Sequence, residues 1–174
     1  FVIARGSKTH VDVVVAELAE GARIGRGEAT AIYYHGESAE SVLAQLESVG
    51  EAIRAGAGRG ALQALLPRGA ARNALDSALW DLEAKRAGMP AWRLAGLGAP
   101  LPLTTAYTIS LGAPAEMEAA ARRASGRYPL LKLKLAGEGD DARVAAVRRG
   151  APTARLIVDA NEAWTGRDVA AEAA

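Results

Sequence analysis

The chain has 174 residues, half of them hydrophobic, and its 21 basic residues nearly balance its 20 acidic ones. This length and composition are typical of a globular protein with one or two small cores and exclude a disordered tail. A net charge of +1 with scattered basic residues gives no reason to expect nucleic acid or a membrane as partner, and the absence of cysteine excludes disulfides and thiolate zinc sites.

The N-terminal segment predicts strands. Residues 11–18 are rich in β-branched side chains, and Gly21, Gly25 and Gly27 punctuate the segment that follows. Residues 1–30 are therefore expected to form a small meander of strands joined by turns.

Two amphipathic helices are predicted next. From Ser38 onward, apolar residues recur at intervals of three and four up to a glycine stop signal, which predicts one helix with the core positions Val42, Leu46, Val49 and Ile53 and an end at Gly56. Residues 71–88 repeat this spacing and also end in glycine. We therefore interpret residues 1–100 as an α+β domain.

Beyond residue 100 the pattern alternates between strand and helix, as in the βα units of a parallel sheet. The predicted strands are residues 104–111, 130–135 and 155–160. Three such units cannot close an eight-stranded barrel. We therefore interpret residues 101–174 as an incomplete β/α (TIM-like) barrel and expect the chain to be a fragment.

The second predicted strand carries two candidate catalytic residues. Lys132 and Lys134 are two residues apart and share one face of the strand, while three leucines lie on the other face. In one interpretation this is an edge strand with solvated lysines. In the other, both ammonium groups point into a barrel mouth, where a poorly hydrated lysine beside a second cation has the lowered pKa of a general base.

A candidate metal ligand ends the third predicted strand. Asp159 occupies the position at which β/α barrels place catalytic groups, and Asn161 follows on the same side. The alternative is that Asp159 caps the next helix. Together, a lysine base and a hard oxygen ligand indicate proton abstraction beside a carboxylate, with Mg²⁺ stabilising the enediolate that develops. Trp164, by contrast, is interpreted as a packing residue.

Phe1 is followed by polar and charged residues, so we expect no signal peptide, and the lack of an initiating Met suggests a trimmed start. No run approaches the roughly 18 apolar residues that a membrane span needs. We expect a cytoplasmic protein with a small-molecule ligand. The sequence leaves the oligomeric state open, a homo-oligomer included.

Seven segments, in order, resemble the bacterial L-Ala-D/L-Glu epimerases of the muconate-lactonising branch of the enolase superfamily: FVIARGSKT, GRGEAT, HGES, ARNALDSALWDLEAKRAG, TAYTISLG, LLKLKL and LIVDANEAW. The resemblance runs through nearly the whole chain. It implies that residues 1–100 form an α+β capping domain over a modified β/α barrel, and that the cofactor is Mg²⁺.

The resemblance also implies roles for individual residues. Lys134 is the expected base on one face of the substrate, Lys132 lies beside the substrate carboxylate, and Asp159 is the first of three magnesium ligands. Thr108 is expected to contact the substrate, and Arg5 to meet its acidic side chain, for which a planar guanidinium is well suited.

Asn161 is a candidate for a residue that supports the metal ligands without binding the metal. The family's two further acidic ligands and its second base lysine are expected on later strands, beyond Ala174. Because inversion needs a base on each face, the chain by itself is expected to be inactive.

The implied reaction is epimerisation of dipeptides such as L-Ala-L-Glu to L-Ala-D-Glu, in murein peptide recycling. Alternatives within the same branch are an N-acylamino acid racemase, an o-succinylbenzoate synthase and a muconate cycloisomerase. An alternative of another class is a catalytically incomplete remnant.

Overall fold

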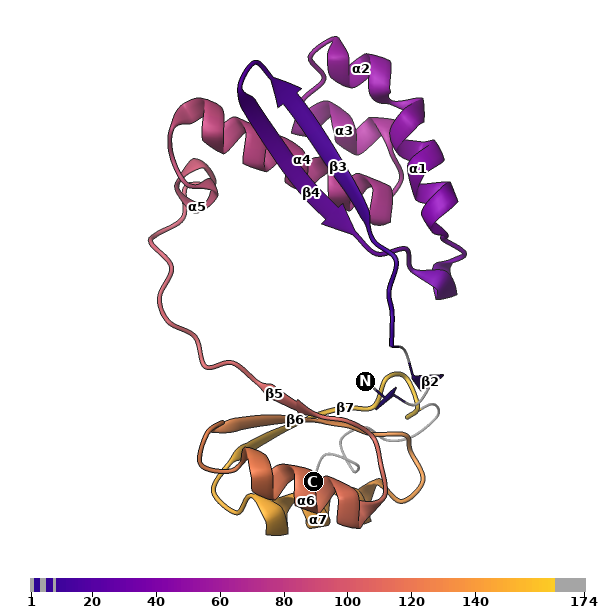
Figure 1. Cartoon of the computed structure of the whole chain (residues 1–174), viewed down its shortest axis with the longest axis vertical. Helices are drawn as coiled ribbons and strands as arrows, with labels where there is room; N and C mark the ends of the chain where they lie inside the picture. The colour runs from indigo at the N-terminus through magenta and orange to yellow at the C-terminus, as the bar shows by residue number, and fades with distance from the viewer. Residues whose placement is uncertain (1, 4–5, 8, 165–174) are drawn as a thin grey trace. The chain divides into compact units, whose positions relative to one another are not determined.

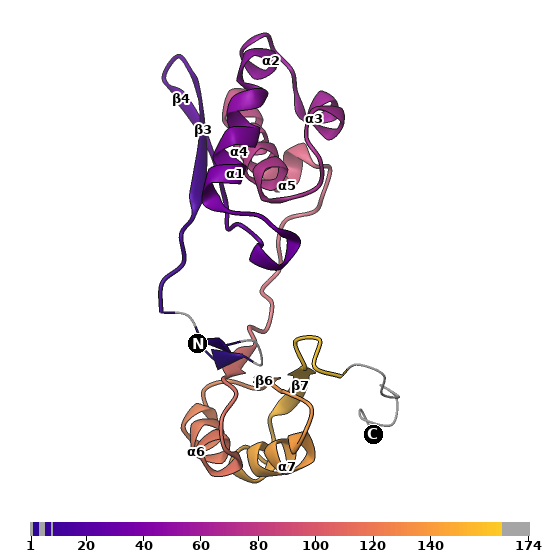
Figure 2. The same ribbon diagram turned by 90° about the vertical axis from the view of Figure 1, so that its right-hand side faces the viewer.

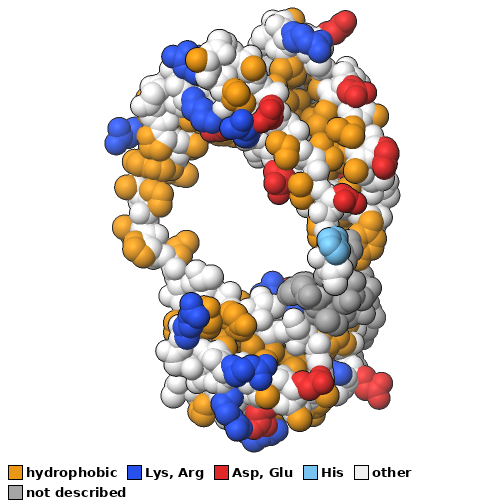
Figure 3. All heavy atoms as spheres, viewed as in Figure 1, with side chains coloured by type: hydrophobic (Ala, Val, Ile, Leu, Met, Phe, Trp, Pro, Cys, Tyr) orange, Lys and Arg blue, Asp and Glu red, His pale blue; other side chains and the backbone are white. Residues whose placement is uncertain are grey.

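A computed structural model of the chain describes residues 2–3, 6–7 and 9–164, and it divides into two compact units. One unit comprises residues 10–101. The other contains residues 102–164 together with two short antiparallel strands, β1 (Val2–Ile3) and β2 (Gly6–Ser7). Figures 1 and 2 show the elements of each unit in two views. Acidic and basic side chains are interspersed on the visible face (Figure 3).

The unit of residues 10–101 consists of a hairpin packed against helices (Figure 1). Strands β3 (Val14–Glu20) and β4 (Arg23–Ala29) pair antiparallel, with Val14 opposite Ala29. The helical elements that follow are η1 (Tyr33–His35), α1 (Ala39–Ser48), α2 (Gly50–Arg54), α3 (Arg59–Leu65), α4 (Ala70–Ala87) and α5 (Ala91–Leu94). No helix in the described residues is long and apolar enough to cross a membrane.

Helix α4 lies along β4 at very short range. The alanines on one face of α4 are buried, and both glycines of β4 contact the backbone of this face. Side chains of α4 also bind backbone groups of β4: Lys85 Nζ donates to Ile24 O at 2.6 Å, and Asp81 Oδ2 accepts from Arg26 N at 2.8 Å. The helix therefore covers an edge that would otherwise be open to pairing with another chain.

The predicted meander of residues 1–30 is present as two separate two-stranded sheets. Gly25 and Gly27, which we interpreted as turn residues, lie inside β4 instead. Their role is to permit the close approach, because a Cβ on Gly27 would overlap the carbonyl oxygen of Ala74. Only Gly21 lies in the connecting turn, with a φ of 57°.

We expect Gly27→Ala to destabilise this unit by about 1–3 kcal/mol, because the added methyl group forces β4 away from α4. Denaturant unfolding followed by circular dichroism measures the loss. Gly58→Ala is the matched control, since nothing lies within 4 Å of a Cβ at that position. Equal stability of the two variants would contradict the close-packing argument.

The single helix predicted from Ser38 to Gly56 is divided into α1 and α2 at Val49. The Ser48 hydroxyl donates to Gln45 O, and a β-branched valine followed by a glycine favours a break. The four core positions predicted from the apolar spacing are nevertheless confirmed. Val42 and Val49 are buried, and Leu46 and Ile53 pack against the same cluster.

The second unit contains a parallel sheet with the order β5-β6-β7. Its strands are β5 (Tyr107–Ile109), β6 (Leu130–Lys134) and β7 (Arg155–Asp159), and they are connected by α6 (Pro114–Ala124) and α7 (Asp140–Gly150). Both helices cover the same face of the sheet (Figures 1 and 2). They lie close enough that a Cβ on Gly150 would overlap Glu118 O. The alternation of strand and helix predicted from the sequence is confirmed.

Candidate active site

The two faces of β6 have different environments. Leu131, Leu133 and Leu135 are buried in a core formed with α6 and α7. Lys132 and Lys134 point to the opposite face, because successive side chains of a strand alternate. The helices α6 and α7 cover the leucine face of the sheet. The lysines therefore lie on the face that these helices do not cover.

Asp159 brings the two lysines together. In the parallel register Lys134 is paired with Asp159, the last residue of β7. The Asp159 Oδ2 atom lies 2.8 Å from Lys132 Nζ and 2.7 Å from Lys134 Nζ. The Lys134 side chain is only 8% exposed, against 35% for Lys132 and 28% for Asp159. The three side chains thus meet at the carboxyl-terminal end of the parallel sheet, and the interpretation of the lysines as solvated residues of an edge strand is wrong, because β6 is the central strand.

The lysine pair sets the charge state of Asp159. The hydrogen bond from Lys132, followed by that from Lys134, holds the pKa of the Asp159 carboxyl well below its usual range, although partial burial acts in the opposite direction. The carboxylate is therefore ionised at all ordinary pH values, as a ligand for a hard cation must be. The cluster contains two basic side chains and one acidic one, a composition that suits a ligand with a carboxylate of its own.

The turn after β7 has an unusual backbone. Asn161 and Glu162 have φ values of 50° and 66°, a left-handed conformation that Asn tolerates but that costs Glu162 roughly 1–2 kcal/mol. Within this turn the Asn161 backbone N–H donates to Asp159 Oδ1 at 3.0 Å and fixes the orientation of the carboxylate. The Asn161 Oδ1 atom is buried and has no hydrogen-bond partner among residues 9–164.

These oxygen atoms fit a hard divalent cation. An ionised carboxylate whose orientation is fixed by a backbone N–H is the donor type that Mg²⁺ prefers, and the unpartnered Asn161 Oδ1 adds a polar oxygen to the same turn. No group of three or more His, Cys, Asp or Glu side chains that could hold a metal occurs in the part of the chain that the structure describes. Among the described residues of this cluster, Asp159 is the one candidate carboxylate ligand for such a site.

The structure describes one of the two remaining predicted substrate contacts, Thr108, and not the other, Arg5. Thr108 of β5 is paired with Lys132, so its side chain lies on the lysine face of the sheet, one strand away. Arg5 lies outside the described residues.

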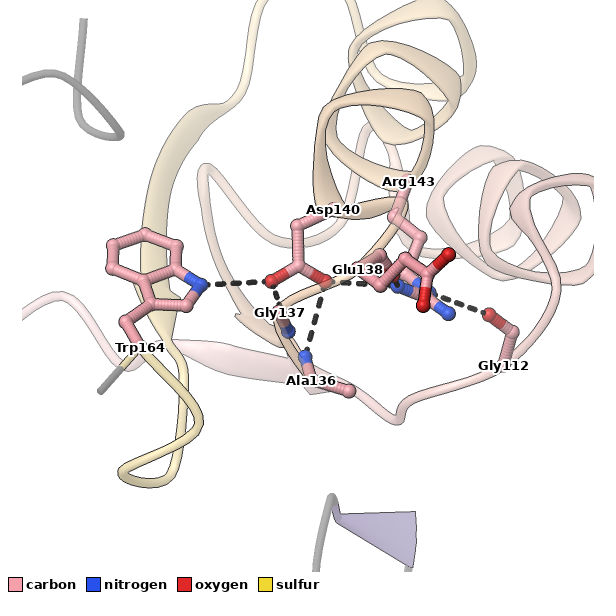
Figure 4. A network of polar contacts seen from close by, with 7 residues as sticks. All are labelled: Gly112, Ala136, Gly137, Glu138, Asp140, Arg143 and Trp164. Carbon is pink, nitrogen blue, oxygen red and sulfur yellow. Dashed lines mark hydrogen bonds and ion pairs between the residues drawn. The ribbon is translucent and has the colours of Figure 1, made fainter. Parts of the chain in front are cut away.

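Sequence reasoning did not single out Asp140, the first residue of α7. Its carboxylate is 3% exposed and accepts hydrogen bonds from the backbone N–H groups of Ala136 and Gly137, from Trp164 Nε1 and from Arg143 (Figure 4). Burial, the largest single influence, raises the pKa of Asp140, but these donors together outweigh it and lower the pKa. The signal in the sequence was an acidic residue directly after a glycine-containing loop.

Residues 1–96 match the N-terminal domain of the mandelate racemase / muconate lactonizing enzyme family. The chain belongs to this family. It thus contains the N-terminal capping domain of the enolase fold, followed by a partial parallel sheet of three strands. The fold class predicted from the sequence is confirmed.

The similarity extends beyond the family's N-terminal domain. The chain is 45% identical over 172 residues to the L-Ala-D/L-Glu epimerase of Escherichia coli, an alignment that covers 98% of this chain and 54% of that protein. The chain spans about half the length of the curated relatives it matches.

Solved structures of the enolase family agree with this similarity. An enolase family member from Agrobacterium tumefaciens with homology to dipeptide epimerases, solved with sodium and L-Ala-L-Glu bound, has a TM-score of 0.90 and 46% identity, covering 99% of this chain and 52% of that chain. The dipeptide epimerase of Enterococcus faecalis, solved with Mg and L-Leu-L-Tyr, has a TM-score of 0.81 and 28% identity, covering 95% of this chain and 50% of that chain.

Proposed function

We propose that the protein containing this chain epimerises acidic dipeptides such as L-Ala-L-Glu to L-Ala-D-Glu. The observation that carries the proposal is the contact of both lysines with Asp159 at the end of a parallel sheet, in a chain of this family. Two cations beside one ionised carboxylate suit a substrate with a carboxylate next to the reacting carbon. The similarity to proteins that are named for this reaction, or were solved with this dipeptide, supports the choice of substrate.

Each described residue has a distinct proposed role. Lys134, the more buried lysine, removes or returns the α-proton on one face of the dipeptide. Lys132, closer to solvent, binds the substrate carboxylate. Thr108 lies on the lysine face of the adjoining strand and orients the substrate from there. Inversion also needs a base on the opposite face, which we expect beyond Ala174.

Asp159 is proposed as one ligand of Mg²⁺, with Asn161 supporting it through the hydrogen bond to Oδ1. When bound, the ion supplies stabilisation of the negative charge that develops on the substrate carboxylate. The chain's own residues prepare this site, since the left-handed turn and the lysine pair hold Asp159 ionised and oriented.

Proton NMR in D₂O tests the proposed function. With Mg²⁺, the full-length protein should replace the α-proton of the Glu residue by deuterium and interconvert L-Ala-L-Glu and L-Ala-D-Glu from either side. Chelation with EDTA should stop both events, and added Mg²⁺ should restore them. A folded, Mg²⁺-supplied protein that neither exchanges nor inverts either dipeptide would exclude this function.

Arg5 is proposed to select the acidic side chain of the substrate. We expect Arg5→Ala in the full-length protein to lower kcat/KM for L-Ala-L-Glu by about 10–100-fold, the effect of losing a hydrogen bond to a charged group. The kcat/KM for a neutral dipeptide such as L-Ala-L-Leu should change little, because the guanidinium contacts a part of the substrate remote from the reacting carbon. An unchanged ratio of the two values would remove Arg5 from substrate selection.

A further inference from the structure

The Asp140 carboxylate connects the loops that follow β6 and β7. Its Oδ1 accepts from Ala136 N at 3.0 Å and its Oδ2 from Gly137 N at 2.7 Å, so both oxygens hold the loop directly after the lysine strand. The Oδ2 atom also accepts a hydrogen bond from Trp164 Nε1 at 2.9 Å, and Trp164 lies in the loop after β7 (Figure 4). One buried side chain thus contacts the loops that follow β6 and β7, the two strands that carry the lysines and Asp159.

Arg143 extends this network to the loop after β5. It lies one helical turn after Asp140, and its Nη1 donates to Asp140 Oδ1 at 2.9 Å and to Glu138 O at 2.6 Å. Its Nε donates to Gly112 O at 3.3 Å, in the loop after β5 (Figure 4). The Asp140–Arg143 pair therefore contacts the loops that follow β5, β6 and β7. These three strands carry Thr108, the two lysines and Asp159, respectively.

The turn after β7 contains one unfavourable backbone conformation. Both Asn161 and Glu162 have positive φ values, which Asn tolerates and Glu does not. The chain leaves this turn at Trp164, whose ring packs against the core of the sheet while its N–H is held by Asp140. Losing that hydrogen bond frees the turn to relax, and the Asn161 N–H that orients Asp159 belongs to the same turn.

We propose that Asp140 is a positioning residue for the candidate active site: through Trp164 it holds the turn that orients Asp159, and through Ala136 and Gly137 it holds the end of the lysine strand. This inference rests on the proposed function. The proposed role goes beyond stabilising the start of α7, because Asp140 also binds Trp164 in the loop after β7. Asp141 has the same charge at the same helix end but is exposed. Asp140 touches neither substrate nor metal in this scheme and acts only through the two loops.

The test compares two pairs of matched substitutions in the full-length protein. Asp140→Asn weakens the network and is compared with Asp141→Asn, which removes the same charge from the same helical turn. Trp164→Phe removes the N–H but keeps an aromatic ring in the core, and is compared with Trp92→Phe in the other unit. Should Asp140→Asn fail to fold, Trp164→Phe still decides the outcome.

Two measurements are made on each variant. Hydrogen exchange followed by mass spectrometry should show faster exchange in residues 136–137 and 160–163 for Asp140→Asn, and in residues 160–163 for Trp164→Phe, but not for the controls. Well below the unfolding temperature, kcat for L-Ala-L-Glu should fall by about 10-fold or more in both test variants, the usual effect of removing a support for a metal ligand. KM should stay within about twofold, because the substrate contacts remain.

The outcomes separate the inference from the function on which it rests. Faster exchange in the two loops with unchanged kcat would overturn the positioning role and leave Asp140 a purely structural residue. Unchanged exchange in both test variants would also overturn it. A wild-type protein without epimerase activity would instead exclude the proposed function. It would exclude the positioning role as well, regardless of the hydrogen exchange measured in the loops. A kcat loss in the test variants alone, accompanied by faster loop exchange, supports the inference.

Discussion

Lys134→Ala should lower the rate of epimerisation in both directions by about 10²–10⁴-fold, the usual contribution of a general acid–base group. Each direction needs one base to take the α-proton and another to deliver a proton to the opposite face. Removing either base therefore blocks both directions. The full-length protein is the appropriate material, since the opposing base is expected beyond Ala174.

One partial reaction should survive in this variant. The epimer whose α-proton faces the opposing base can still lose it and regain a deuteron on the same face. In D₂O, proton NMR should thus record exchange without inversion for one dipeptide epimer and no exchange for the other. Undiminished exchange of both epimers would eliminate Lys134 as the base of one face.

Lys132→Ala provides the comparison for this experiment. Its ammonium group also contacts Asp159, at 2.8 Å, but its proposed role is to bind the substrate carboxylate, which both epimers share. We therefore expect it to slow the exchange of the two epimers equally. A face-specific loss with Lys132→Ala and a symmetric loss with Lys134→Ala would reverse the two assignments.

Asp159→Asn should suppress exchange of both epimers by about 100-fold or more, because the charge stabilisation that a bound metal supplies amounts to several kcal/mol and serves both faces. The substitution retains the size of the side chain but leaves the two ammonium groups without their carboxylate. Isothermal titration should show weaker Mg²⁺ binding as well. Asp141→Asn removes an exposed carboxylate from the same unit and should change neither quantity.

Stability must be measured alongside activity for Asp159→Asn. Lys134 is nearly buried, and removing one partner of such an ion pair is destabilising. Circular dichroism at the assay temperature gives the folded fraction, by which the rates are corrected. Wild-type Mg²⁺ affinity in a folded Asp159→Asn protein would rule out Asp159 as a ligand.

Much of the second unit could be predicted because its signals are local. The LLKLKL segment encodes its two faces by simple alternation, and the structure buries Leu131 and Leu133 while Lys132 and Lys134 meet Asp159. The end of β7 at Asp159 likewise follows from an apolar run that stops at a charged residue. Such patterns constrain a strand without knowledge of its neighbours.

The features that were missed depend on contacts between distant residues. Gly25 and Gly27 were assigned to turns because nothing nearby in the sequence reveals that α4 will approach β4 so closely. Asp140 and Asp141 are adjacent acidic residues that the sequence does not distinguish, and only the fold shows that Asp140 binds Trp164 while Asp141 is exposed. The contact of Lys132 and Lys134 with Asp159 is observed. The catalytic, metal-binding and substrate-binding roles stay predictions for all six site residues: Arg5, Thr108, Lys132, Lys134, Asp159 and Asn161.

The close contact between β4 and α4 also constrains how the first unit forms during synthesis. An isolated two-stranded hairpin is marginally stable in water, so the β3–β4 pair depends on α4 for its stability. Ala29 ends β4 and Ala70 begins α4, a separation of about 40 residues that a ribosome needs roughly 2–8 seconds to cover. During that interval the nascent hairpin presents its two glycines and an uncovered edge, a state in which chaperones or neighbouring chains can bind it.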